Sequence, residues 1–137
     1  MKLELEEKLT ALAPVFLRDM HGDETKTCMA FGIECSDGWF AIVKEMCEKI
    51  EAVNRRLNGE ALVVADQIKE KFGELTVYYS IDGEVDSNVR DEVRSIVVEA
   101  EAKSWDVCEE CGKPATCTTK GWIRRLCKEC YDRRSKN

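Results

Sequence analysis

The sequence has one histidine, His21, and no stretch near the roughly 18 consecutive apolar residues of a membrane span. Its start, Met-Lys-Leu-Glu-Leu-Glu-Glu, lacks both the basic region and the apolar run of a signal peptide. These absences predict a cytoplasmic chain with no membrane partner, in a compartment where thiols stay reduced. We therefore expect the eight cysteines to act as metal ligands and small core residues, not as disulfides.

The scarcity of histidine also restricts catalysis. A cysteine nucleophile needs a neighbouring base, and His21 stands beside Gly22 at the end of an expected helix, where a cation is favoured without any catalytic role. We interpret Cys28, Cys35 and Cys47 as buried cysteines of ordinary core elements. Because no nucleophile, acid and base come together in the pattern, the sequence favours a protein that is not an enzyme.

Charge is plentiful but unevenly distributed. Charged residues make up 35% of the 137 residues and hydrophobic ones 44%, with a net charge of −6, which fits one domain or a domain with a small appendage. Residues 104–137 contain eight Lys/Arg and five Asp/Glu, a formal +3, which leaves −9 on the remainder. Four thiolates on one Zn²⁺ would reduce the tail to about +1, so electrostatics gives little support to nucleic-acid binding.

Apolar periodicity predicts the elements of residues 1–103. A helical pattern covers residues 3–20, and Pro14 should kink or split it near Ala13. Residues 28–35 alternate and predict a strand with one buried face. A strong apolar stripe then predicts a helix from Trp39 to Leu57.

Two further strands and a helix are expected after that. Residues 61–81 read as a hairpin that turns at Gly73-Glu74, with Leu62, Val64 and Ile68 on one face. Residues 65–72 also contain good helix formers, so a short helix there stays open as an alternative. A last helix should run from Asp86 or Ser87 to about residue 103. The expected fold is α+β: a three-stranded antiparallel sheet with helices on one face.

The strongest motif lies in residues 104–137, where Cys-x2-Cys, fifteen residues and a second Cys-x2-Cys follow one another. This spacing predicts one structural zinc ion held by Cys108, Cys111, Cys127 and Cys130, with no open position for a catalytic water. The intervening residues suit a hairpin that turns near Lys120-Gly121, and a short basic helix should begin at Cys127. The segment resembles zinc ribbons and treble-clef fingers, and we expect Cys117 to be a hairpin side chain and not a ligand.

Two other groups of residues are candidate contacts. An aromatic mixed with cations suits nucleic acid or an acidic protein surface, and the residues concerned are Trp122, Arg124, Arg125, Arg133 and Arg134. A turn at a strand–helix junction, together with residues of the hairpin, could line a small-ligand pocket, and the residues concerned are Asp37, Trp39, Lys69 and Tyr78.

Three short motifs suggest a family. They are Gly-Ile-Glu-Cys-Ser-Asp-Gly-Trp-Phe (32–40), Gln-Ile-Lys-Glu-Lys-Phe-Gly-Glu-Leu (67–75) and the terminal Cys-x2-Cys-Gly. Together they resemble a group of small, largely uncharacterised bacteriophage and prophage proteins with a terminal zinc ribbon. The resemblance implies a host-cell cytoplasmic setting and an accessory or anti-defence role, and it carries over no catalytic residues.

From these observations we expect a non-enzymatic zinc-containing binding protein that engages a host or phage protein. Two alternatives stay open. One is a nucleic-acid-binding regulator that uses the basic zinc module, and the other is a protein that binds or sequesters a small nucleotide-like ligand.

Overall fold

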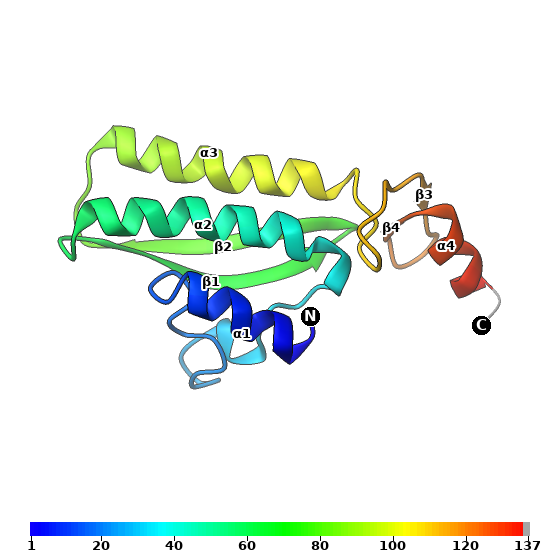
Figure 1. Ribbon diagram of the computed structural model, residues 1–137, viewed down its shortest axis with the longest axis horizontal. Helices are drawn as coiled ribbons and strands as arrows, with labels where there is room; N and C mark the ends of the chain where they lie inside the picture. The colour runs from blue at the N-terminus through cyan, green and yellow to red at the C-terminus, as the bar shows by residue number, and fades with distance from the viewer. Residues whose placement is uncertain (136–137) are drawn as a thin grey trace.

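A computed structural model describes residues 1–135 of the chain as a mixture of helices and short sheets (Figure 1). In chain order the elements are α1 (Leu3–Leu12), η1 (Cys28–Phe31), η2 (Asp37–Trp39), α2 (Phe40–Leu57), β1 (Leu62–Lys71), β2 (Glu74–Asp82), α3 (Ser87–Ser104), β3 (Cys117–Thr118), β4 (Arg125–Leu126) and α4 (Lys128–Ser135). Among the described residues, no helix combines the length and apolar character that crossing a membrane requires.

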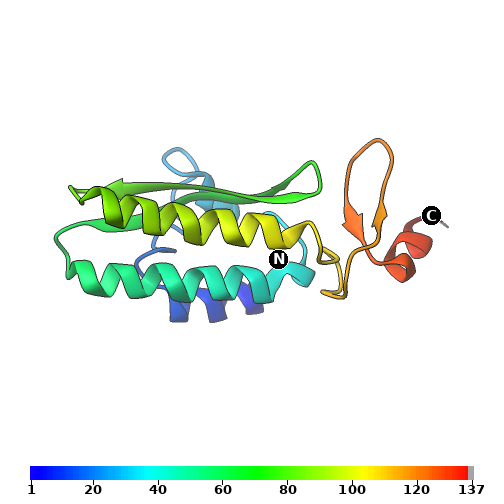
Figure 2. The same cartoon turned by 90° about the horizontal axis from the view of Figure 1, so that it is seen from above.

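A long antiparallel hairpin of β1 and β2 forms the centre of the larger part of the molecule. Helices α2 and α3 lie side by side along one face of this hairpin, and α1 packs against α2 (Figures 1 and 2). The stripe of α2 is buried as its periodicity predicts, and the helix is capped after Leu57 by Asn58, which adopts a left-handed conformation with φ 49°. Asp86 caps α3 by accepting the backbone N–H of Val89 at 3.0 Å.

A β-bulge decides which side chains of β1 face the helices. The register of the hairpin shifts between Ala65 and Gln67, so Asp66 is an extra residue in β1. Val63, Ala65 and Ile68 consequently share the core face, whereas strict alternation predicts Leu62, Val64 and Ile68. The expected hairpin is confirmed, but its turn is Phe72-Gly73 and not Gly73-Glu74, since Glu74 already belongs to β2. The alternative helix over 65–72 is wrong, and so is the predicted facing of the first strand of the hairpin.

The third strand predicted over residues 28–35 is not formed, and the sheet has two strands. Thr27 instead accepts the backbone N–H of Met29 at 3.1 Å and starts the 3-10 turn η1. Gly32 then adopts φ +73°, which no extended strand contains. Only Glu34 pairs with β1, donating to the carbonyl of Ile68 at 2.9 Å and accepting from the N–H of Glu70 at 3.0 Å.

Helix α1 ends at Leu12, and the predicted break near Ala13 is confirmed. The helical pattern predicted as far as residue 20 is wrong beyond that break, because residues 14–20 form turns. The turns that follow Pro14 are tied to α2 by the buried carboxylate of Glu51. This carboxylate accepts the backbone N–H groups of Val15 at 3.2 Å and Phe16 at 3.1 Å. Phe16 in turn accepts the N–H of Ala65, so the irregular segment covers part of the β1 edge.

The stability of the core should depend on Asn54, which is buried on α2 and hydrogen-bonds both the backbone N–H and the carbonyl of Val63. Its side-chain N–H₂ donates to the Val63 carbonyl at 3.0 Å, and its oxygen accepts the Val63 N–H at 2.8 Å. We expect Asn54→Ala to lower the free energy of unfolding by about 1–3 kcal/mol, since it leaves two buried backbone groups unpaired. Urea denaturation measures this.

Arg56→Ala, on the same helix, is the control. It removes only an exposed ion pair with Glu92, and we expect a change of less than about 1 kcal/mol. Equal losses in the two variants would contradict the role assigned to Asn54.

Candidate metal centre and the adjoining cleft

Four cysteines converge at the end of the molecule that holds β3, β4 and α4. The sulfurs of Cys108, Cys111, Cys127 and Cys130 all lie within 4.8 Å of one another. Three of the four residues are buried, and Cys111 is exposed. Such a set of sulfurs could hold one metal ion, and four protein ligands leave no position for a reacting water.

Local backbone geometry brings the sulfurs together. In the first Cys-x2-Cys turn, Gly112 takes φ +82° and its N–H donates to the carbonyl of Cys108 at 2.9 Å. In the second turn the N–H of Cys130 donates to the sulfur of Cys127 at 3.4 Å, at the start of α4. The β3–β4 pairing of Cys117 with Leu126 brings the second pair back to the first, as the predicted hairpin requires.

The electrostatics of the cluster favour ionisation at one sulfur. The backbone N–H of Cys130 is the main reason that the pKa of Cys127 is lowered to about 7. Burial, followed by the neighbouring sulfurs, raises the pKa of Cys130. Four thiolates this close together would repel one another, and a cation between them would offset that repulsion.

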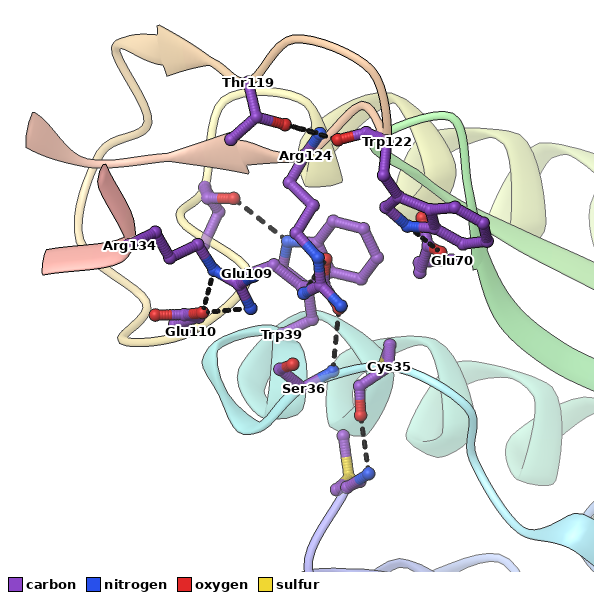
Figure 3. A network of polar contacts seen from close by, with 12 residues as sticks. Cys35, Ser36, Trp39, Glu70, Glu109, Glu110, Thr119, Trp122, Arg124 and Arg134 are labelled. Carbon is purple, nitrogen blue, oxygen red and sulfur yellow. Dashed lines mark hydrogen bonds and ion pairs between the residues drawn. The ribbon is translucent and has the colours of Figure 1, made fainter. Parts of the chain in front are cut away.

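Glu109, inside the first Cys-x2-Cys turn, joins the cysteine cluster to the helical part of the molecule (Figure 3). Its side chain is 1% exposed. One carboxylate oxygen accepts the backbone N–H of Ser36 at 2.9 Å, and the other accepts Arg124 at 3.2 Å. Its carbonyl also accepts the N–H of Gly38 at 2.7 Å. A charged group this deeply buried has to be fully hydrogen-bonded, and Glu109 meets that condition.

The Asp-Gly-Trp motif is the other side of this junction. Trp39 is fully buried, and its indole N–H donates to the carbonyl of Val107 at 3.0 Å. A Cβ on Gly38 would lie 2.2 Å from the carbonyl oxygen of Cys108, so only glycine fits. The motif that suggested a ligand pocket therefore serves to pack the first Cys-x2-Cys turn against α2.

The structure does not bring together the four residues of the predicted pocket. Trp39 is buried in the core, and Asp37 bonds the backbone N–H of Lys2 at 2.8 Å. Lys69 and Tyr78 follow the register of the outer hairpin face, opposite to the core residues. Of the four, Lys69 alone lines the cleft between the hairpin tip and the β3–β4 loop.

The arginines predicted to contact nucleic acid are already engaged. Arg124 pairs with Glu109 and Arg134 with Glu110, the latter at 2.6 Å. Arg133 reaches the sulfur of Cys130 at 3.5 Å. Arg125 donates to the carbonyl of Trp105 at 2.8 Å and stacks 4.5 Å from its ring centroid. Trp122 donates its indole N–H to Glu70 at 3.1 Å, but it is 72% exposed, so most of its ring is open to solvent.

A cleft of about 510 Å³ opens between the tip of the β1–β2 hairpin and the β3–β4 loop. Its lining residues are Glu34, Lys69, Glu70, Lys71, Phe72, Gly121, Trp122 and Ile123. The sequence reasoning placed Trp122 and Lys69 in different sites and missed Glu70 and Phe72. The sequence feature that could have indicated this cleft is Phe72-Gly73. A bulky aromatic residue occupies the first position of a two-residue hairpin turn, where Asn or Asp is usual.

The remaining cysteines are mostly as expected. Cys35 and Cys47 are buried core residues, and burial raises both pKa values, that of Cys35 to about 12. Cys28 is exposed, so its interpretation as a buried cysteine is wrong; it lies at the start of η1 and not in a strand. Cys117 lies in β3, as expected of a hairpin side chain. His21 donates its Nε2–H to the Glu6 carboxylate at 2.8 Å.

Comparisons with protein-family models, curated proteins and solved structures yield no match for this chain. Its function has to be inferred from the residues themselves.

The junction depends on Glu109, and its neighbour Glu110 offers a matched test. We expect Glu109→Ala to destabilise the protein by about 1–3 kcal/mol, because the Ser36 N–H and Arg124 lose a shared buried acceptor. Amide exchange of Ser36 and Gly38 should accelerate, which mass spectrometry of deuterated peptides detects. Glu110→Ala removes a more exposed pair with Arg134 and should leave this exchange unchanged. Unaltered exchange in Glu109→Ala would refute the junction.

Proposed function

We propose that this protein is a non-enzymatic binding protein whose C-terminal cysteine cluster holds one structural zinc ion. The observation that carries the proposal is the position of the cleft. One wall, from Gly121 to Ile123, belongs to the loop that the cysteine cluster supports, and the other belongs to the tip of the main hairpin. A metal ion at the cluster would therefore stabilise a binding surface without taking part in chemistry.

The ligand chemistry supports zinc. Four sulfurs at about 2.3 Å from a tetrahedral zinc lie about 3.8 Å apart, and the sulfurs of Cys111 and Cys127 are 3.6 Å apart. Soft thiolates in a closed set select zinc over the hard cations that prefer oxygen. Among the described residues, Leu126 is the one other fully buried apolar side chain clustered with the cysteines, so this part of the chain has little apolar core of its own. Metal binding would therefore supply much of its folding energy.

The surface beside the cluster has the character of a binding site. Phe72 and Trp122 are 71% and 72% exposed and line the same cleft, and exposed apolar side chains that adjoin one another mark interaction surfaces. A Cβ on Gly73 would lie 3.1 Å from Ile123 and 3.4 Å from the Trp105 ring, so the hairpin tip is in close contact with the module. The two walls of the cleft are thereby held together.

The engagement of a host or phage protein, and the mobile-element origin implied by the resemblance, remain predictions. The paired arginines argue against a nucleic-acid regulator that binds through them. A role as a nucleotide-binding protein gains support instead, although at the cleft and not around Asp37 and Trp39.

Native mass spectrometry of the gently purified protein tests the zinc proposal. The intact chain should carry one zinc ion, and Cys127→Ser should lose it, because three thiolates bind zinc far more weakly than four. Residues 104–135 of that variant should exchange their amides rapidly, while residues 1–103 stay protected.

Cys117→Ser is the matched control, since it changes a cysteine of the same module outside the cluster. It should retain one zinc per chain. Loss of zinc from Cys117→Ser, or a metal-free intact chain after purification without chelator, would contradict the assignment. Melting of the whole Cys127→Ser chain in one step would contradict the independent folding of residues 1–103.

A further inference from the structure

We propose that the cleft beside Trp122 binds a guanine nucleotide, with the base held by Glu70 between aromatic side chains. The inference rests on the proposed role as a binding protein and assigns its ligand class. Three independent features of the cleft carry it: two exposed aromatic rings, one unsatisfied carboxylate oxygen and two unpaired cations.

The aromatic rings come from both walls. Trp122 is presented by a braced loop, in which Thr119 donates to the Trp122 carbonyl at 2.5 Å and accepts the Arg124 N–H at 2.8 Å (Figure 3). Phe72 is at the tip of the hairpin opposite. Flat, exposed rings on a braced backbone are the platform on which nucleobases stack, worth about 1–3 kcal/mol per base.

The backbone at Phe72 indicates that its ring is placed for a ligand. Phe72 and Gly73 have φ +53° and +83°, the conformation of a tight two-residue hairpin turn. A bulky side chain with positive φ is disfavoured, and here the ring is 71% exposed, so burial does not compensate. Residues in such unfavourable backbone conformations are typical of functional sites. At Phe72 the adjoining cleft is the site that the exposed ring would serve.

Glu70 supplies the specific contact. One of its oxygens accepts the indole N–H of Trp122 at 3.1 Å. The other is buried and is the sole buried side-chain N or O atom in residues 1–135 found without a hydrogen-bond partner. A carboxylate only accepts hydrogen bonds, so this oxygen lacks an N–H or O–H donor. Because it is covered, a donor from outside the chain reaches it only when the exposed Trp122 side chain shifts and its indole N–H releases the other oxygen. A buried acceptor without a donor costs free energy that a bound ligand would restore.

Guanine matches this acceptor better than the other bases. Its Watson–Crick edge offers two adjacent N–H donors, N1–H and N2–H₂, to a carboxylate. Adenine and cytosine present a ring-nitrogen acceptor beside their amino group, and uracil has a carbonyl on each side of its single N–H. Each of these three bases would therefore place an acceptor lone pair against a carboxylate oxygen, which is repulsive. Reading bases by this edge after stacking is the usual mode for unpaired nucleotides.

The phosphate has cations available. Lys69 and Lys71 line the cleft, and neither side chain forms an ion pair with any described residue. Two lysines suit a mononucleotide phosphate as point charges. The protein's net charge of −6 disfavours long polyanions, so we assign the site to guanine with its own phosphate, either free or at an accessible position of a single strand.

Isothermal titration of the zinc-loaded chain with GMP, AMP, CMP and UMP tests the inference. We expect GMP to bind at least tenfold more tightly than the other three. Glu70→Gln should abolish that preference, because a side-chain amide has one acceptor oxygen, whereas the two N–H donors of guanine require two. Trp122→Ala should weaken every nucleotide at least tenfold, since stacking is lost. Glu84→Gln, an exposed acid outside the cleft, should leave GMP binding unchanged.

Zinc content is measured for each variant, because retained zinc shows that the module wall is folded. A second titration compares GMP with a short single-stranded RNA that contains one guanine among uracils. Whichever binds with the higher affinity shows whether the site takes a free nucleotide or a guanine within a strand. Equal affinity for all four nucleotides, no binding of GMP by the zinc-loaded chain, or an unchanged preference in Glu70→Gln would overturn the inference.

Different results would contradict the guanine site and the proposed function. A zinc-loaded chain that binds no nucleotide but retains a protein partner would overturn the guanine site and leave the binding role standing. A chain without zinc would overturn the structural role of the metal whatever it binds.

Discussion

The buried carboxylate of Glu109 is the contact on which the arrangement of the whole molecule depends. It lies within the first Cys-x2-Cys turn and is bonded both to Ser36, which precedes the Asp-Gly-Trp segment, and to Arg124. Because it is almost wholly shielded from water, its charge is tolerated only while both partners stay in place. The position of the cysteine cluster relative to the helices is therefore fixed by polar bonds with defined directions, and not by apolar contact alone.

That arrangement brings two structures together at the cleft. The tip of the β1–β2 hairpin and the β3–β4 loop belong to parts of the chain that are far apart in sequence, and each is braced by its own contacts. Trp122 reaches across to Glu70 and joins them (Figure 3). A metal ion at the cysteines would act on the cleft indirectly, by keeping the loop of Trp122 folded.

The sequence predicted those features that depend on short-range patterns. The cysteine spacing identified the cluster, the apolar stripe identified α2, and Pro14 marked the end of α1. These succeed because each is a local rule of geometry or chemistry. Residues 28–35 failed because Gly32 and the Thr27 side chain override an alternation that looks like a strand.

The candidate contacts were harder to predict for a different reason. A positive charge in sequence looks available, yet Arg124, Arg125 and Arg134 find partners only through the tertiary fold. Glu70, in turn, is one acid among 27 acidic residues, and only its buried, unpaired oxygen distinguishes it. Neither property can be read from residue order.

The bulge at Asp66 has a consequence for how this protein can vary during evolution. Every residue between it and the hairpin turn owes its facing to that one additional position, including Ile68 in the core and Glu70 at the cleft. Losing a single residue there would turn the rest of β1 over and exchange its buried and exposed sides. Homologous chains should therefore tolerate many replacements in this strand but keep its length, so that alignments would show substitutions and almost no gaps between Val63 and Phe72.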